Sequence, residues 1–340
     1  MTPAEDGPAA ENRAPAAAEN RGPAAAGSRA PAAAGGELAT TVGSLFFASP
    51  VMTASGTAGH GAELGAYGRL DQLGAVVVKS LAAFAWPGST GPRVHGVAGG
   101  SMVNRVGLQG PGVDAWRARD LPALAESGAA VVASIWGRTV EDYEAAAAAL
   151  AGTGAQGVVA VEVNVSCPNV EDRSKMFAHS PAATAEAVAA AGAAGLPRWA
   201  KLSPNVGDLC EIASAALGAG AEALVLVNTL LGIALDPDAP AGGPPVPLAG
   251  GLSGAALHPV AVRAVFDCRQ AFPDAGIVGV GGVASGRDAR AFVAAGADAV
   301  QVGTATFADP RAPWKVQSEL AAWCRRHGMT VKEMVGAALR

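Results

Sequence analysis

The sequence lacks the features that mark several large classes of protein. No uninterrupted apolar run approaches the roughly 20 residues that a bilayer-spanning helix needs, so we expect no transmembrane segment. The 24 Lys and Arg residues are outnumbered by 29 Asp and Glu residues, and they form no basic block that could neutralise a row of phosphates. These absences argue against a membrane protein and against nucleic acid as a partner.

Cysteine and histidine are too scattered to form a metal site or a disulfide framework. The four cysteines are far apart and include no CxxC pair; they are Cys167, Cys210, Cys268 and Cys324. None of the five histidines forms an HxxxH pair or lies at metal-ligand spacing from a carboxylate. The first residues also show no basic stretch followed by an apolar core. We therefore expect a metal-independent protein of the reducing cytoplasm.

The first 36 residues differ in composition from the rest of the chain. They contain an eight-residue repeat, at 11–18, 19–26 and 27–34, with Arg third, Pro fifth and Ala in the last three positions. Apart from proline, the unit has no apolar side chain larger than Ala, so it cannot offset the entropy that is lost on ordering. The sequence predicts a disordered tail over residues 1–36 and a folded domain over residues 37–340.

From residue 37 onward, short apolar runs alternate with Ala-rich stretches of helical period, which is the pattern of repeated βα units. Strands are expected at 50–54, 75–79, 130–134, 158–164, 198–202, 223–228, 277–281 and 299–303. Helices are expected at 140–152, 181–194, 206–219, 259–271, 286–295 and 312–327. Eight such units favour an α/β fold of the (β/α)8 TIM barrel type over a doubly wound sheet, with insertions at 80–129 and 229–276.

Polar residues end several of the expected strands, and in a barrel the carboxyl ends of the strands build the active site. These residues are Ser55, Lys79, Ser80, Asn164, Lys201, Asn228 and Thr229. Buried amides and ammonium groups without partners cost about 1 to 3 kcal/mol each. A single Lys after an apolar strand is more often ion-paired than a ligand, but several such groups on one rim predict a polar ligand.

Glycine loops follow the last two expected strands. Residues 279–283 and the pair Gly303-Thr304 supply flexible backbone and N–H groups where barrels commonly hold a phosphate. A third glycine loop, residues 250–254, follows the sixth strand and its insertion. The alternative is that these glycines only form tight βα turns that require positive φ.

Cys167 lies just beyond the fourth expected strand, in a polar loop between Asn164 and Asn169. A free cysteine is usually a small buried hydrophobic residue, and we expect this of the other three, which lie in helical stretches. Cys167 differs because its loop is polar. Its thiol is suited to act as a nucleophile or as an acid/base, because the environment can tune the ordinary thiol pKa of about 8.5.

Several motifs resemble the dihydroorotate dehydrogenase family. They are NVSCPNV at 164–170, KLSPNV at 201–206 and NTLLG at 228–232, together with GPRV at 91–94, NRVGLQ at 104–109 and the 250–254 loop. The likeness extends from about residue 41 to the C-terminus. A cysteine at position 167 resembles the soluble class 1 enzymes. Within class 1, the motifs are similar to the branch that passes electrons to NAD through a partner subunit with FAD and an iron–sulfur cluster.

The resemblance implies FMN-dependent oxidation of dihydroorotate to orotate in pyrimidine biosynthesis, by an enzyme that we expect to be a homodimer. It implies FMN contacts at Ala54, Ser55, Gly56, Lys79, Ser80, Asn164, Lys201, Gly254, Gly281, Gly282, Gly303 and Thr304. It implies substrate contacts at Lys79, Asn104, Gly107, Leu108, Asn169, Asn228 and Thr229. Cys167 as thiolate would be the base, and Lys201 would stabilise the negative charge that reduction places on the flavin.

Two segments depart from the family pattern. Ser134 stands where the family has an asparagine, with Trp136 close to it, and the usually glycine-rich segment after Cys167 is replaced by a charged run at 171–179. Three alternatives therefore stand beside the implied activity. They are a flavin-dependent oxidoreductase of another dihydropyrimidine or an enone, a flavin-free phosphate-binding barrel isomerase or lyase, and a non-enzymatic scaffold.

Overall fold

The computed structural model describes residues 36–167, 176–235 and 247–340. One parallel sheet has the strand order β3-β14-β13-β10-β9-β8-β7-β4. The strands are β3 (Val51–Thr53), β4 (Val76–Val77), β7 (Val131–Ile135), β8 (Val158–Asn164), β9 (Arg198–Leu202), β10 (Ala223–Leu226), β13 (Gly276–Val280) and β14 (Ala299–Val302). The sheet closes where Gly74 N donates to Val51 O at 2.8 Å and Thr53 N donates to Ala75 O at 3.2 Å. The expected (β/α)8 barrel is confirmed.

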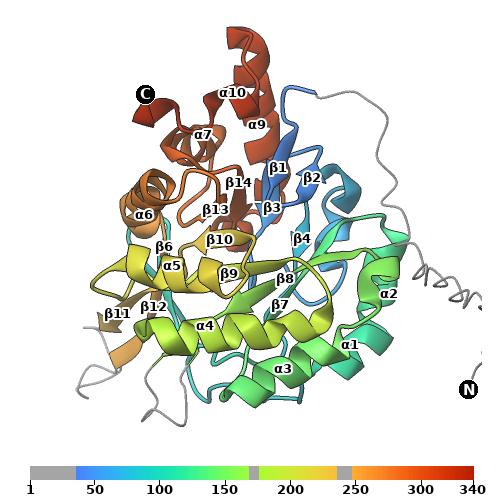
Figure 1. Ribbon diagram of the computed structural model, residues 1–340. Coiled ribbons are helices and arrows are strands. Elements are labelled where there is room, and N and C mark those ends of the chain that lie inside the picture. The colour runs from blue at the N-terminus through green and yellow to red at the C-terminus, as the bar shows by residue number, and fades with distance from the viewer. Residues whose placement is uncertain (1–35, 168–175, 236–246) are drawn as a thin grey trace, which may run out of the picture. The chain divides into compact units, whose positions relative to one another are not determined.

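Helices follow the strands and surround the barrel (Figure 1). They are α1 (Val113–Arg119), α2 (Leu121–Glu126), α3 (Val140–Ala149), α4 (Pro181–Ala190), α5 (Leu209–Gly218), α6 (His258–Ala271), α7 (Gly286–Ala295), α8 (Ala305–Ala308), α9 (Ala312–His327) and α10 (Val331–Met334). Side chains of Thr139, Ser180, Asp208 and Ser285 accept backbone N–H groups at the starts of α3, α4, α5 and α7, which fixes where these helices begin. Among the described residues, no helix is long and apolar enough to cross a membrane.

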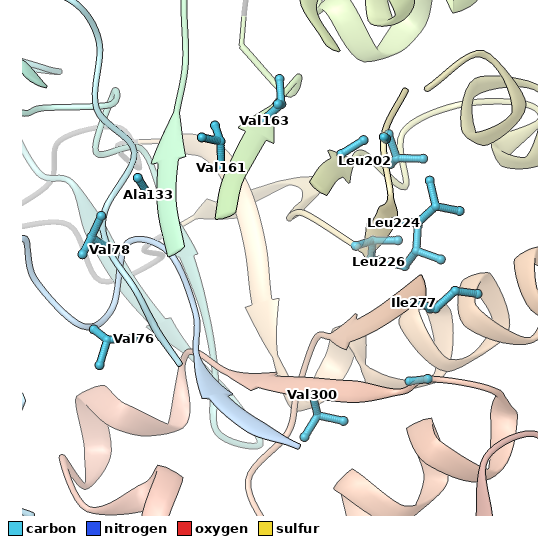
Figure 2. Close-up of a cluster of buried hydrophobic side chains, with 14 of the residues drawn as sticks. Val76, Val78, Ala133, Val161, Val163, Leu202, Leu224, Leu226, Ile277 and Val300 are labelled. Atoms are coloured by element: carbon cyan, nitrogen blue, oxygen red, sulfur yellow. The ribbon is translucent and has the colours of Figure 1, made fainter. Parts of the chain in front are cut away.

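Side chains of the barrel strands alternate between the barrel interior and the layer beneath the helices. In β9, Trp199 belongs to the inner cluster, whereas Ala200 and Leu202 belong to the outer one. Figure 2 shows the outer cluster, to which Val161 of β8 and Leu224 of β10 also contribute. Because side chains alternate along each strand, only every second residue can reach the barrel interior. A polar residue at such an inner position must find its hydrogen-bond partners inside the barrel.

A hairpin that the sequence analysis did not predict precedes the first barrel strand. It pairs β1 (Thr40–Val42) with β2 (Leu45–Phe47). Phe47 packs edge-on against Trp199 with ring centroids 6.0 Å apart. Because both rings belong to the inner cluster, the hairpin covers the end of the barrel interior opposite the carboxyl ends of the strands.

The two long gaps between barrel strands jointly build a second sheet. Its four antiparallel strands have the order β11-β12-β6-β5. They are β5 (Val94–Val97), β6 (Ser101–Asn104), β11 (Leu230–Leu235) and β12 (Pro247–Gly254). Gly251 pairs with Asn104, and the Asn104 side-chain amide donates to Gly251 O at 3.2 Å. The pairing thus brings motifs that are far apart in the sequence to one side of the barrel.

Candidate active site

A cavity of about 360 Å³ lies between the carboxyl ends of the barrel strands and the inserted sheet. This volume falls in the range of about 300 to 1,000 Å³ that is usual for small-molecule sites. The predicted site residues that line it are Ala54, Ser55, Gly56, Lys79, Ser80, Asn104, Gly107, Leu108, Asn164, Lys201, Asn228, Thr229, Gly254, Gly281, Gly282, Gly303 and Thr304. Cys167 is not on the cavity wall, and Asn169 lies outside the described residues.

Asn164 is the centre of the hydrogen-bond network in the cavity wall. Its Oδ1 accepts from Ser166 N at 3.1 Å and from Asn228 Nδ2 at 3.0 Å, and its Nδ2 donates to Ser80 Oγ at 3.3 Å. These bonds tie the ends of three barrel strands together. The Ser166 hydroxyl, which also lines the cavity, has no hydrogen-bond partner among the described residues.

Ser80 extends this network toward the first and third barrel strands. Its hydroxyl lies 3.2 Å from Ser55 Oγ and 2.9 Å from Ser134 Oγ. Ser134 is fully buried at the position where the family pattern has an asparagine. The shorter side chain is therefore satisfied inside the protein by Ser80 and does not leave an unpaired polar group.

Lys201 belongs to a buried polar triad that the sequence analysis did not anticipate. Its Nζ lies 3.3 Å from Glu162 Oε1 and donates to Gln301 Oε1 at 3.2 Å, and Gln301 Nε2 donates to Glu162 Oε2 at 2.7 Å. Glu162 and Gln301 are fully buried, and Lys201 is 5% exposed. A signal was present, because each is a buried polar residue within a strand whose immediate neighbours on either side are apolar.

Lys79 presents a cationic group to the cavity. Within the described ranges, no carboxylate lies at salt-bridge distance from its ammonium group. Burial lowers the pKa of Lys79, and the nearby charge of Arg93 lowers it further. Both effects disfavour the charged form of Lys79 when it has no counter-ion. An anionic ligand bound in the cavity would supply that counter-ion and stabilise the charged lysine.

Glycine is required where the two glycine loops that contain Gly254 and Gly282 meet at the cavity wall. A Cβ on Gly282, whose φ is +67°, would lie 2.7 Å from the carbonyl oxygen of Gly254. A Cβ on Gly254, whose φ is +90°, would lie 2.5 Å from the carbonyl oxygen of Gly100. Among the described residues, neither Gly282 nor Gly303 donates its backbone N–H in a hydrogen bond. These N–H groups and the close backbone approach suit a phosphate.

The loop at 107–108 lines the cavity in a left-handed conformation. Leu108 is the one described non-glycine residue with positive φ, at 60°. The preceding Gly107 has φ of 71°, and a Cβ there would lie 2.6 Å from Ser89 N. The indole of Trp86 donates to Gly107 O at 3.0 Å and holds the loop in place. A backbone kept in this uncommon region by its surroundings is typical of a binding site.

Cys167 lies beneath the cavity wall. Its side chain is fully buried and packs with Ala82 and Trp136, and its Sγ donates to Asn164 O at 3.3 Å. Burial raises the pKa of the Cys167 thiol to about 12, although the neighbouring Tyr143 hydroxyl acts in the opposite direction. The sequence placed Cys167 in a polar loop; the structure instead surrounds the thiol with apolar side chains.

An aromatic cluster stands behind Cys167. The rings of Phe84, Trp86 and Trp136 meet edge to face, with centroids 5.9 to 6.1 Å apart. The Arg138 guanidinium lies over the Phe84 ring at 4.4 Å from its centroid. Trp136, which departs from the family pattern, is therefore part of this cluster and does not line the cavity.

Comparison with known proteins decides what kind of site this is. A sequence profile of dihydroorotate dehydrogenase matches residues 37–323. The chain belongs to the dihydroorotate dehydrogenase family. It is therefore an oxidoreductase, which removes the isomerase, lyase and scaffold alternatives. The resemblance inferred from the cavity motifs is confirmed.

Several curated members of the dihydroorotate dehydrogenase family are similar over nearly their whole length, and each is named dihydroorotate dehydrogenase B (NAD(+)), catalytic subunit. The protein of Geobacter sp. strain M21 is 40% identical over 305 residues, which cover 88% of this chain and 98% of the relative. That of Desulforudis audaxviator is 43% identical over 308 residues, covering 89% and 97%. That of Alkaliphilus oremlandii is 42% identical over 292 residues, covering 85% and 94%.

Proposed function

We propose that this chain oxidises dihydroorotate to orotate with FMN as the hydride acceptor, as a step of pyrimidine biosynthesis in the cytoplasm. One observation carries the proposal. Residues from motifs spread along the whole folded domain line a single cavity of small-molecule size, in a chain whose family is that of dihydroorotate dehydrogenase.

The residues of the cavity fit FMN. Gly254, Gly282 and Gly303 offer close-approaching backbone and N–H groups for its phosphate. Asn164 and Lys201 offer an amide and an ammonium group for the nitrogen and oxygen atoms of the flavin ring. Bound FMN would supply the redox chemistry, and the protein would supply binding, orientation and electrostatics.

The opposite part of the cavity fits a dihydropyrimidine carboxylate. The amides of Asn104 and Asn228 both donate and accept hydrogen bonds, which matches a ring edge of alternating C=O and N–H groups. Lys79, which has no carboxylate partner among the described residues, suits the substrate carboxylate. Thr229 continues the same wall and adds a hydroxyl group.

Cys167, which lies directly behind Asn164 of the cavity wall, is proposed as the base, and this role requires its thiol to reach the substrate from there. The Cys167 thiolate would take the proton that leaves one substrate carbon, and bound FMN would supply the acceptor for the hydride that leaves the neighbouring carbon. Because burial raises the pKa of Cys167 to about 12, the thiolate is the minor form at neutral pH and a strong base once formed. Lys201 would stabilise the negative charge that develops on the flavin.

We also propose that electrons leave through a partner subunit with FAD and an iron–sulfur cluster. The similar proteins are named catalytic subunits of an NAD-linked enzyme. In this chain the cysteines lie too far apart in sequence to ligate such a cluster together, and no dinucleotide-binding fingerprint follows the first strand. A second protein would therefore supply the route to NAD.

A substrate panel tests the proposed reaction. The purified chain is first assayed for bound flavin. It is then assayed for reduction of an artificial dye with one of three electron donors: dihydroorotate, dihydrouracil or a saturated cyclic ketone, which is the reduced form of an enone. We expect bound FMN and turnover with dihydroorotate. Turnover with dihydrouracil but not with dihydroorotate would show that the substrate is another dihydropyrimidine. A purified protein that binds no flavin would overturn the proposal.

A further inference from the structure

A buried carboxylate lies beside Lys201 and has no part in the reaction described above. Glu162 is fully buried at an inner position of β8, and Lys201 is on the neighbouring strand β9. Gln301 reaches the same point from β14, which is not adjacent to either strand in the sheet. Taking a carboxylate out of water is costly unless it is paired, so its presence at this position calls for a specific role.

The three side chains form a closed set of interactions. Lys201 contacts Glu162 and Gln301 at the same time, and the Gln301 amide group donates to the second carboxylate oxygen of Glu162. An ammonium group has three donors, and these contacts use two of them. Because Lys201 also lines the cavity, its remaining donor is available there. The lysine cannot leave this position without unpairing a buried carboxylate.

We propose that Glu162 is a positioning residue that, with Gln301, holds the Lys201 ammonium group at the cavity and offsets its charge, and thereby sets the reduction potential of the bound flavin. This inference rests on the proposed FMN function. Reduction places negative charge on the flavin, and a nearby net positive charge favours the reduced form. Lys201 alone would contribute that charge in full, whereas the Lys201–Glu162 pair is neutral.

Glu162→Gln is the first test, because it removes the charge and keeps the shape and a carbonyl oxygen for Lys201. The potential of bound FMN is measured by equilibration with a reference dye, so no catalytic turnover is needed. We expect a more positive potential, with the equilibrium constant for two-electron reduction raised about tenfold, which corresponds to about 30 mV. An equilibrium constant within about twofold of the native value would overturn the inference.

A charge exchange supplies the matched control. Gln301→Glu adds a second negative charge beside Lys201 and should shift the potential in the opposite direction. The double variant Glu162→Gln with Gln301→Glu returns the net charge to that of the native triad and should return the potential toward the native value. A merely structural role predicts no such reversal, so a double variant that deviates further than either single variant would contradict the proposal.

The series separates this inference from the proposed function. If the native chain binds no FMN, the proposed function fails and the inference fails with it. If native and variant proteins bind FMN but their potentials do not follow the charge, only the inference fails. Should Glu162→Gln not fold because the buried charge of Lys201 loses its counter-charge, the Gln301→Glu protein still tests the sign of the shift.

Discussion

The thiol of Cys167 and the hydroxyl of Tyr143 donate to the same acceptor, the carbonyl oxygen of Asn164, at 3.3 and 2.7 Å. Tyr143 is fully buried, and burial raises its pKa well above the ordinary value, so its hydroxyl keeps its proton and remains a donor. The strand end that places Asn164 in the cavity wall therefore also fixes the thiol behind it. This relationship makes the chemistry of Cys167 open to direct tests.

Replacing the thiol should affect the chemical step and leave the cofactor in place. Cys167→Ser is nearly isosteric, so we expect FMN binding to persist, while flavin reduction by dihydroorotate at neutral pH slows by roughly 10² to 10⁴ because a hydroxyl is a much weaker base. Rapid-mixing absorbance measures the rate. Cys210→Ser, at a half-buried position at the start of α5, is the matched control. A variant rate within a few fold of the native rate would remove Cys167 from the mechanism.

The rate of flavin reduction should rise with pH. Burial raises the pKa of Cys167 to about 12, so the thiolate fraction grows throughout the neutral and mildly alkaline range. Rapid-mixing measurements on the native protein from neutral to alkaline pH should show this rise, and Cys167→Ala, which has no ionisable group at this position, should not show it. A native rate that is already constant across neutral pH would mean that the thiol is ionised there, contrary to its buried environment.

Adding a methyl group to Gly282, at the proposed FMN phosphate site, should weaken FMN binding. In Gly282→Ala the new Cβ would lie 2.7 Å from a backbone carbonyl, and we expect the affinity for FMN to fall at least about tenfold, or about 1.4 kcal/mol. Gly328→Ala is matched in conformation, with φ of +61° against +67°, but its Cβ would meet nothing within 4 Å. Fluorescence titration of each apoprotein with FMN measures the two affinities. Equal affinities would contradict the proposal that the close backbone contact at Gly282 helps to bind the FMN phosphate.

The isolated chain should reduce NAD very poorly. Its separated cysteines and the lack of a dinucleotide fingerprint give it no evident second redox site. Dihydroorotate-dependent NAD reduction is compared with reduction of fumarate and of a quinone by the same preparation. Rapid NAD turnover without any added protein would show that no partner subunit is needed, and brisk fumarate turnover would point to a self-sufficient enzyme.

The local parts of the fold could be read from the sequence, and the long-range parts could not. Two strands, β8 and β9, and two helices, α7 and α9, have the predicted bounds, because apolar period and capping residues are local signals. The inserted sheet was not predicted, because it pairs segments from two separate gaps whose partners no local pattern specifies.

The same distinction holds within the site. Motif residues at strand ends could be assigned to one cavity because all strands of a parallel barrel end on one side. The sequence marks Glu162, Lys201 and Gln301 individually as polar residues within strands, but it does not show that they meet, because Glu162 and Gln301 are 139 positions apart and come together across the barrel interior. The burial of Cys167 was also missed, because it depends on Trp136 and its aromatic neighbours and not on the polar residues that flank the cysteine.

The most direct test of the proposed reaction is an anaerobic titration of the native chain with dihydroorotate, following the visible absorption of the bound flavin and the orotate formed. We expect the flavin to bleach completely and one orotate to appear for each FMN reduced, since one hydride, which carries two electrons, passes from substrate to cofactor. Flavin that stays oxidised in the presence of excess dihydroorotate would contradict it.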